Sequence, residues 1–219
     1  MKNVGILGGT FNPIHLGHTL PAQVVCRYLA LDKLLLIPAN TPPHKSSPNV
    51  SAKERATMVA LACEDYPNLI CDDHELKRDG YSYTVDTLKS LSSSHPNTRF
   101  YFIMGLDSLL TFTQWHKYQE ILTYCHLIVN TRPHYQLDNI NRETKALLSS
   151  HRVDKLDDLK TMASGGIFFL PHSLSEYNEQ LNLNISSTAI RQRLINKQEC
   201  QHMLDPKVLA FINKNKLYR

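Results

Sequence analysis

Short apolar segments alternate with amphipathic segments along most of this chain, and no other feature limits its possible folds as strongly. Each apolar run is short and bounded by polar or turn-forming residues, which predicts β-strands. The predicted strands are residues 4–7, 34–38, 69–71, 100–104, 127–130 and 167–170. The predicted helices are residues 51–65, 84–91, 115–122, 188–195 and 206–214. This alternation predicts an α/β fold, a doubly wound and mainly parallel sheet with helices on both faces.

Length and composition favour one main domain. We expect residues 1–184 to form a Rossmann-like core and residues 185–219 to form a small helical part packed on it. Hydrophobic residues make up 42% of the 219 residues, enough for a sizeable core. The net charge of +4 suits a small anionic substrate but lacks the clustered basic surface of a nucleic-acid-binding protein. We expect a monomer or a small homo-oligomer.

Neither a membrane span nor an export signal is visible. No apolar run reaches about 18 residues, and the chain begins with a strand pattern, so we expect a cytoplasmic protein. The five cysteines are scattered and form no CxxC pair, which predicts reduced thiols rather than disulfides or a thiolate metal site. These cysteines are Cys26, Cys63, Cys71, Cys125 and Cys200.

The segment GGTFNPIHLGH (residues 8–18) follows the first predicted strand. Its two glycines allow a sharp turn and a close approach of the backbone to a ligand. Because proline is tolerated in the first turn of a helix, Pro21 predicts a helix that starts near residues 18–21. His15 and His18 then lie at a helix N-terminus, where free N–H groups favour anions. This arrangement suits a phosphate chain and a transition state that gains negative charge.

Other interpretations of the same segment stay open. The same sequence could also form a glycine turn in which the two histidines have no function. A Walker A lysine loop and a GxGxxG pattern are both absent, which argues against an ordinary ATPase and a dinucleotide oxidoreductase. The spacing of His15 and His18 allows a transition-metal site, but the sequence offers no obvious third ligand.

Two further segments place hydroxyl groups at predicted helix starts. In ISSTAIR (residues 185–191), Arg191 lies one turn beyond Ser187, which predicts a second cradle for an anion. In SYT (residues 82–84), free N–H groups at the start of the next helix would suit a carboxylate. An ordinary N-cap is the alternative for both segments.

These motifs resemble the nucleotidyltransferase superfamily, whose HxGH element is matched by His15, Gly17 and His18. Within it, the chain resembles the bacterial nicotinate-nucleotide adenylyltransferases nearly from end to end. The SYT and DSLL…W segments are far more specific than HxGH. Asn12 departs from the pattern, since many relatives carry Asp there, and we expect no change of chemistry. The matching segments, in order, are PPHK (42–45), GYSYTVDTL (80–88), MGLDSLLTFTQWHKYQEIL (104–122), TRP (131–133), ISSTAIR (185–191) and VLAFINKNKLY (208–218).

The resemblance implies transfer of the adenylyl group of ATP, bound with Mg²⁺, to nicotinate mononucleotide. The implied catalytic residues are His15, His18 and Arg191. The implied ATP-binding residues are Gly8, Gly9, Thr10, Phe11, Gly17, Gly105, Asp107, Arg132, Ile185, Ser186, Ser187 and Thr188. The residues implied to bind nicotinate mononucleotide are Thr10, His44, Lys45, Ser82, Tyr83, Thr84 and Trp115. No protein side chain is expected to hold the metal, which would bind through ATP.

Several of these assignments have a plain structural alternative. Trp115, the only tryptophan, resembles the family's residue that stacks on the pyridine ring, but an isolated tryptophan also suits a core. Asp107 would bind ribose hydroxyls or assist a metal, or cap a helix. Lys45 would contact a phosphate, or be an ordinary surface lysine. Rival functions are adenylylation of nicotinamide mononucleotide or pantetheine phosphate, and a nucleotide sensor without catalysis.

Overall fold

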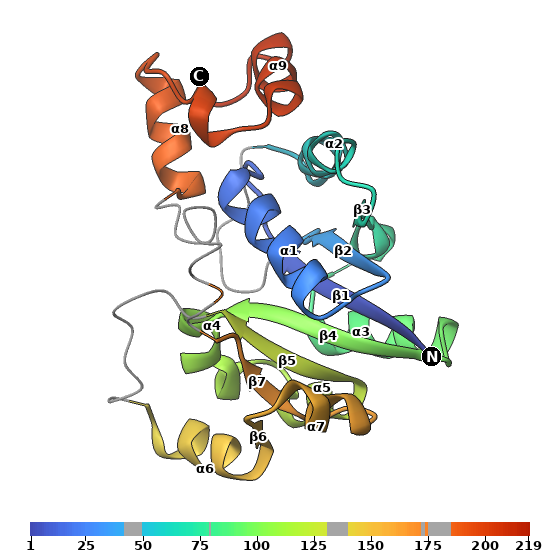
Figure 1. Cartoon of the computed structure of the whole chain (residues 1–219). Coiled ribbons are helices and arrows are strands. Elements are labelled where there is room, and N and C mark those ends of the chain that lie inside the picture. The colour runs from blue at the N-terminus through green and yellow to red at the C-terminus, as the bar shows by residue number, and fades with distance from the viewer. Residues whose placement is uncertain (42–49, 79, 131–139, 172–173, 175–184) are drawn as a thin grey trace.

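The computed structural model describes residues 1–41, 50–78, 80–130, 140–171, 174 and 185–219 (Figure 1). Within that part of the chain, seven strands form one sheet in the order β3-β2-β1-β4-β5-β7-β6. All six strand pairs are parallel, which confirms the predicted doubly wound sheet. The strands are β1 (Lys2–Gly9), β2 (Lys33–Pro38), β3 (Leu69–Cys71), β4 (Thr98–Gly105), β5 (Cys125–Asn130), β6 (Arg152–Val153) and β7 (Ile167–Phe169).

Helices cover both faces of the sheet (Figure 1). The α-helices are α1 (Leu16–Tyr28), α2 (Ala52–Cys63), α3 (Thr84–Ser94), α4 (Leu106–Leu110), α5 (Tyr118–Tyr124), α6 (Arg142–His151), α7 (Leu156–Thr161), α8 (Ser187–Ile195) and α9 (Pro206–Lys214). The short 3₁₀ helices are η1 (His74–Lys77), η2 (Phe112–Gln114) and η4 (Gln201–Met203).

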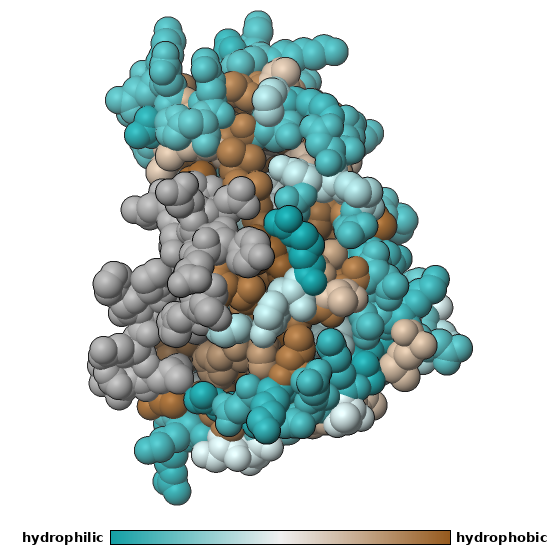
Figure 2. Space-filling model, in the orientation of Figure 1, coloured by the Kyte–Doolittle hydropathy of each residue, from teal (hydrophilic) through white to brown (hydrophobic). Residues whose placement is uncertain are grey.

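Alternating side chains of the strands build a separate core on each face. In β2, Leu34 and Leu36 pack with α1 and α2, whereas Leu35 and Ile37 pack with α3 and α4. All four leucine and isoleucine side chains are buried, as expected for a strand covered on both sides. Figure 2 shows mostly hydrophilic residues over the outer surface of one face of the molecule, with hydrophobic residues in view near its centre. The sheet is therefore a rigid platform for the loops at its carboxyl edge.

Residues 133–166 contain elements that the sequence pattern did not reveal. They include α6, β6 and α7. Helix α7 has six residues and only Leu159 buried, and β6 has two residues at the sheet edge. A period needs several repeats to be seen, so α7 and β6 give no measurable periodicity. Helix α6 is longer and buries Thr144, Leu147 and Leu148 at helical spacing, but the prediction did not include it.

The predicted helix at residues 115–122 begins too early. Trp115 has an extended backbone, φ −72° and ψ 146°, and ends η2. Lys117 is left-handed, with φ 51°, and α5 starts only at Tyr118. The Trp115 ring packs against Phe112, three residues away, and against Phe102 of β4, with ring centroids 5.5 and 6.0 Å apart. Contacts between aromatic rings therefore favour a bend that helix propensity does not predict.

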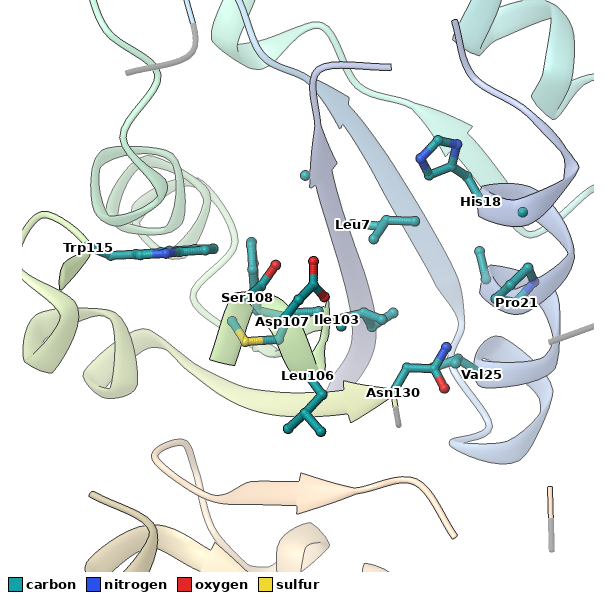
Figure 3. Close-up of a pocket in the computed structure, with 16 residues that line it drawn as sticks. Leu7, His18, Pro21, Val25, Ile103, Leu106, Asp107, Ser108, Trp115 and Asn130 are labelled. Carbon is teal, nitrogen blue, oxygen red and sulfur yellow. The ribbon is translucent and has the colours of Figure 1, made fainter. Parts of the chain in front are cut away.

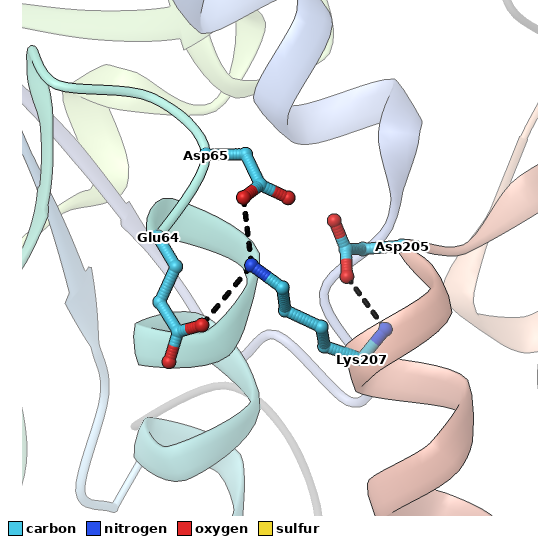
Figure 4. A network of polar contacts seen from close by, with 4 residues as sticks. All are labelled: Glu64, Asp65, Asp205 and Lys207. Atoms are coloured by element: carbon cyan, nitrogen blue, oxygen red, sulfur yellow. Dashed lines mark hydrogen bonds and ion pairs between the residues drawn. The ribbon is translucent and has the colours of Figure 1, made fainter.

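The C-terminal helices share a core with the sheet. Val208 and Ile212 of α9 are buried in the cluster that also contains residues of α1 and α2. At the surface, Lys207 Nζ lies 3.1 Å from Glu64 Oε2 and 2.7 Å from Asp65 Oδ1 (Figure 4). These ion pairs are exposed and contribute little, so apolar packing holds α9 against α2. The boundary at residue 184 stays a prediction.

Burial accounts for the chemistry of the cysteines. All five are free thiols, and all except the partly exposed Cys71 are buried, as predicted for core residues. Burial raises the pKa of the Cys63 thiol to about 12 and that of Cys71 to about 11, so both stay protonated and unreactive at neutral pH. Among the described helices, none is long and apolar enough to cross a membrane.

A buried histidine makes stability depend on pH. His126 is 0% exposed; its Nδ1 accepts the Gly166 N–H at 3.1 Å, and its Nε2 lies 3.3 Å from the Met162 carbonyl oxygen. Burial lowers its pKa from 6.5 to about 4. The unfolded chain therefore takes up a proton below pH 6.5 that the folded protein does not, so stability falls as the pH drops from 6.5 towards 4.

We expect this residue alone to cost about 2 kcal/mol of unfolding free energy between pH 7 and pH 5. The variant His126→Asn keeps an acceptor near the Nδ1 position and does not titrate, so its stability should vary less with pH. Urea unfolding of both proteins at the two pH values measures the difference. Equal pH dependence in the two proteins would contradict this assignment.

Candidate active site

The site lies where the order of the sheet reverses. Successive strands run from β1 through β2 to β3 on one side, whereas β4 pairs with the other side of β1. Ligands of doubly wound sheets bind at this switch point, beyond the carboxyl ends of the strands. A cavity of about 340 Å³ lies there. Its lining residues are Leu7, Gly8, Gly17, His18, Pro21, Ala22, Val25, Phe102, Ile103, Met104, Gly105, Leu106, Asp107, Ser108, Trp115 and Asn130.

The two histidines form a close pair of rings, tilted by 32°, at the start of α1. His15 is the N-cap and His18 the third helical residue. The His15 N–H donates to His18 Nδ1 at 3.3 Å, and the two ring centroids are 3.8 Å apart. His18 lines the cavity, whereas His15 is only 6% exposed. The structure therefore places both imidazoles at a helix N-terminus, as predicted, with His18 facing the cavity.

The predicted start of α1 at residues 18–21 is wrong, because the helix begins at Leu16. Pro21 lies inside the helix as its sixth residue. An interior proline costs about 3 kcal/mol, but α1 buries Val24 and Val25, and each buried valine returns about 1.5–3 kcal/mol. Packing of the buried face therefore outweighs the local rule.

Gly17 is required by close packing around the histidine pair. A Cβ at Gly17 would lie 3.0 Å from His15 Nδ1 and 3.4 Å from the Ile185 side chain. The glycine of the HxGH element therefore lets the His15 ring fold back over the first turn of α1. The same close approach brings the residues just before α8 against α1, although the two segments are far apart in the sequence.

The loop between β1 and α1 is held by a buried arginine that the sequence analysis did not single out. Arg55 of α2 is 1% exposed and donates to the Thr10 carbonyl at 2.6 Å and to the Ala39 carbonyl at 2.7 Å. Within the loop, Phe11 is left-handed (φ 47°), and its ring meets His18 edge-on at 5.1 Å. Gly9 gives this ring room, since a Cβ there would lie 3.0 Å from it.

The start of α8 closes on the same loop. Ser187 Oγ donates to the Pro13 carbonyl at 2.9 Å, and Arg191 donates to the Asn12 carbonyl at 2.8 Å. Ser186 is the N-cap of α8, since its Oγ accepts the Ala189 N–H at 3.1 Å, as the alternative interpretation required. The two helix starts thus converge on one loop. Thr10, Phe11, Ile185 and the residues of α8 do not line the cavity.

Aromatic residues border the opposite side of the cavity. Trp115 is partly buried, with its ring edge-on to Phe102 at 6.0 Å. In Figure 3 the rings of Trp115 and His18 lie on opposite sides of the cavity, and the Asp107 carboxylate points into the space between them. The Tyr83 ring contacts the His116 ring at a tilt of 35°, with ring centroids 4.4 Å apart, which joins the SYT segment to the residue that follows Trp115. Trp115 is therefore neither a pure core residue nor a free surface ring.

The SYT segment begins α3, as predicted. Tyr83 is the N-cap and Thr84 the first helical residue. Ser82 Oγ accepts the Asn40 N–H at 2.9 Å, which fixes the segment to the loop after β2. Beneath it, Glu75 is 8% exposed and accepts the Thr87 hydroxyl at 2.7 Å; burial raises the pKa of this carboxyl, while hydrogen bonds from Thr87 and Ser82 oppose the shift. These contacts tie the segment to its surroundings.

Oxygen ligands at the cavity are few. Gly105 is the N-cap of α4, so Asp107 does not cap that helix; a Cβ at Gly105 would overlap the Asp107 carboxylate. Among the residues described, no group of three or more His, Cys, Asp or Glu side chains is placed to hold a metal ion. The predicted site residues His44, Lys45 and Arg132 lie outside the described residues.

Comparisons with known proteins agree with the motifs. A family model for cytidylyltransferase-like proteins matches residues 6–193. A protein of Aeromonas hydrophila named "Probable nicotinate-nucleotide adenylyltransferase" is 40% identical over 216 residues, 99% of this chain and 97% of its own length. The nicotinate-nucleotide adenylyltransferase of Escherichia coli O6:H1 is 38% identical over 221 residues, the full length of both chains.

The fold also matches a solved structure. The nicotinic acid mononucleotide adenylyltransferase of Plasmodium falciparum, complexed with NaAD, superposes with a TM-score of 0.73 over 100% of this chain and 98% of that one. At 19% identity this likeness supports the fold. The full-length identity and the family match together confirm the resemblance drawn from the motifs: the chain belongs to the cytidylyltransferase-like family and, within it, to the nicotinate-nucleotide adenylyltransferases.

Proposed function

We propose that the protein transfers the adenylyl group of ATP to nicotinate mononucleotide, giving nicotinate adenine dinucleotide and pyrophosphate in NAD biosynthesis. One observation carries the proposal. His18, at the N-terminus of α1, and Trp115 border the same cavity from opposite sides. The phosphates of ATP beside the start of α1 and the pyridine ring of the mononucleotide beside Trp115 would then lie in the same cavity. Membership of the family points to the same reaction.

The reaction is an in-line displacement. A phosphate oxygen of the mononucleotide bonds to the α-phosphorus of ATP, and the bond from that phosphorus to the bridging oxygen breaks, so pyrophosphate leaves with the electron pair. The attacking oxygen is already ionised at pH 7, so no general base is needed. Catalysis then consists of holding two phosphates in line and stabilising the charge on the transferred group.

On the ATP side, His18 and the first N–H groups of α1 would stabilise that charge, because the helix N-terminus carries a partial positive charge. Gly8 and Gly105 would let the nucleotide approach the backbone. Ser187 and Arg191 would support the same phosphates from α8, since both already contact the loop that precedes α1. Thr188, bonded to Arg191 at 3.2 Å, belongs to this group.

On the acceptor side, the N-terminus of α3 would bind the nicotinate carboxylate, and Trp115 would stack on the pyridine ring. This helix start favours the acid over nicotinamide mononucleotide, since only the acid carries the negative charge. Pantetheine phosphate has no ring to stack on Trp115. A sensor without catalysis would not need His18 against its phosphates.

Mg²⁺ would reach the site with ATP, whose oxygens and several waters it prefers as ligands. Asp107 could add one oxygen ligand, since its carboxylate is the one acidic group among the described residues that line the cavity. The ion would supply charge neutralisation on the phosphates. The protein's own part is to orient those phosphates at α1.

Supplying ATP and Mg²⁺ with nicotinate mononucleotide, nicotinamide mononucleotide or pantetheine phosphate tests this function. We expect the acid to give a product with the mass of nicotinate adenine dinucleotide, in competition with the amide. Mass spectrometry identifies the product and a pyrophosphate assay gives the rate. A protein that binds ATP but releases no pyrophosphate with any of the three acceptors would be a sensor instead.

Replacing His18 tests the charge-stabilising role. We expect His18→Ala to lower kcat by about two to four powers of ten, as for loss of a transition-state donor. Steady-state kinetics measures this effect. His202→Ala is the matched control, because His202 is exposed and lies on η4, outside the residues that line the cavity. Near-normal turnover of a folded His18→Ala protein would refute the role.

Gly17→Ala tests the packing of the histidine pair without removing either imidazole. The added Cβ would press on the His15 ring, 3.0 Å from its Nδ1. Because a misplacement of about 1 Å can cost about 100-fold in rate, we expect kcat to fall by about 10-fold to 100-fold. Thermal melting should show a folded protein. Unchanged kcat would mean that the pair tolerates displacement.

A further inference from the structure

The last residues of the chain return to the loop that precedes the catalytic helix. The Tyr218 hydroxyl donates to Asn12 Oδ1 at 2.6 Å, across 206 residues of sequence. Asn12 lies three residues before His15, the N-cap of α1. This contact therefore joins the C-terminus to the segment that places the histidine pair.

Tyr218 is held firmly enough to act as a support. It follows α9, where the Leu217 N–H donates to the Ile212 carbonyl at 3.0 Å. The Tyr218 backbone is left-handed, with φ 59°, a conformation that is unfavourable for a bulky residue. Such a conformation persists where the surrounding contacts determine it. Here the ring packs against the core cluster that contains Ile212.

The hydroxyl lies among charges but remains a proton donor. Arg55 and Arg191 both lower the pKa of Tyr218 and Glu54 raises it, but burial dominates and raises it above its ordinary value. The phenol is therefore protonated at neutral pH. Its partner is a neutral amide oxygen, so the bond needs no change of charge on either side.

Three side chains from other segments donate hydrogen bonds to the backbone of this loop. Arg55 holds the Thr10 carbonyl, Arg191 holds the Asn12 carbonyl and Ser187 holds the Pro13 carbonyl. Tyr218, by contrast, bonds to the side chain of Asn12 rather than to the backbone. Asn12 is thus fixed twice, by its backbone from α8 and by its side chain from the C-terminus.

We propose that Tyr218 is a positioning residue for adenylyl transfer, which acts through Asn12 on the histidine pair and does not touch substrate. This inference rests on the proposed function, because it assigns His15 and His18 to the transition state. Without the hydroxyl, the loop keeps the hydrogen bonds to its backbone carbonyls but loses the bond from Tyr218 to the Asn12 side chain. The imidazoles then spend less time in the productive geometry, which lowers kcat more than the affinity for either substrate.

A double-mutant cycle tests the proposal. We expect Tyr218→Phe and Asn12→Ala each to lower kcat by about 5-fold to 10-fold, as for loss of one partly buried hydrogen bond, with KM for both substrates changed less than about 2-fold. The double variant should be no slower than the slower single variant. Asn12→Asp keeps the acceptor oxygen and should restore kcat. Tyr28→Phe, a partly buried tyrosine at the far end of α1, is the matched control and should leave kcat unchanged.

Imidazole NMR signals give a readout that does not depend on activity. Tyr218→Phe and Asn12→Ala should shift the ring signals of His15 and His18 alike, and Tyr28→Phe should leave both in place. Wild-type kcat in Tyr218→Phe, or losses that multiply in the double variant, would overturn the inference. If the wild-type protein made no dinucleotide, the proposed function would fail, whereas the imidazole signals would still decide whether Tyr218 acts on the pair.

Discussion

The buried guanidinium of Arg55 joins the loops that follow β1 and β2, and the geometry of the site depends on that junction. It donates to the carbonyls of Thr10, Ala39 and Asn40, so one planar group fixes the carboxyl ends of two neighbouring strands. Burial lowers its pKa, yet an arginine keeps its charge in proteins. An unpaired buried charge would cost several kcal/mol, and the three carbonyls offset part of that cost without a carboxylate, while the Nε–H stays buried without a partner among the described residues. The site therefore keeps a positive charge beside the loop where anions would bind.

The strands were predictable because their environment imposes a simple pattern. Strands covered on both faces must be apolar at nearly every position, so segments such as residues 34–38 and 127–130 stand out in the sequence. The three site motifs were also predictable from local signals. Glycines that follow a strand mark the histidine pair, and hydroxyl residues that precede a helix mark the ISSTAIR and SYT segments. Each of these signals needs only neighbours along the chain. The fold class and the motifs therefore followed from the sequence.

The contacts that were not predictable are those whose partners are distant backbone groups. In the sequence, Arg55 is an ordinary arginine on the helix that begins after Ser51. No neighbouring residue indicates that it bonds to the carbonyls of Thr10 and Ala39. Glu75 was not predictable for another reason: its partner is a side chain, the Thr87 hydroxyl, that lies on another helix. The start of α1 was misjudged for a related reason: the local cost of Pro21 is visible in the sequence, whereas the packing of Val24 and Val25 that exceeds it is not.

The C-terminal helices do not line the cavity, but they support the loop that places the histidine pair. α8 supplies two donors to the loop, α9 shares the core under α1 and α2, and Tyr218 reaches Asn12. The same loop accepts hydrogen bonds from α2, α8 and the C-terminus, so all three segments contribute to its conformation. Such a loop favours binding of a flexible triphosphate. The entropy cost of ordering the loop is met once, when the chain folds, and does not reduce the affinity for the ligand. The position of His18 is thus a property of the whole molecule rather than of the motif that contains it.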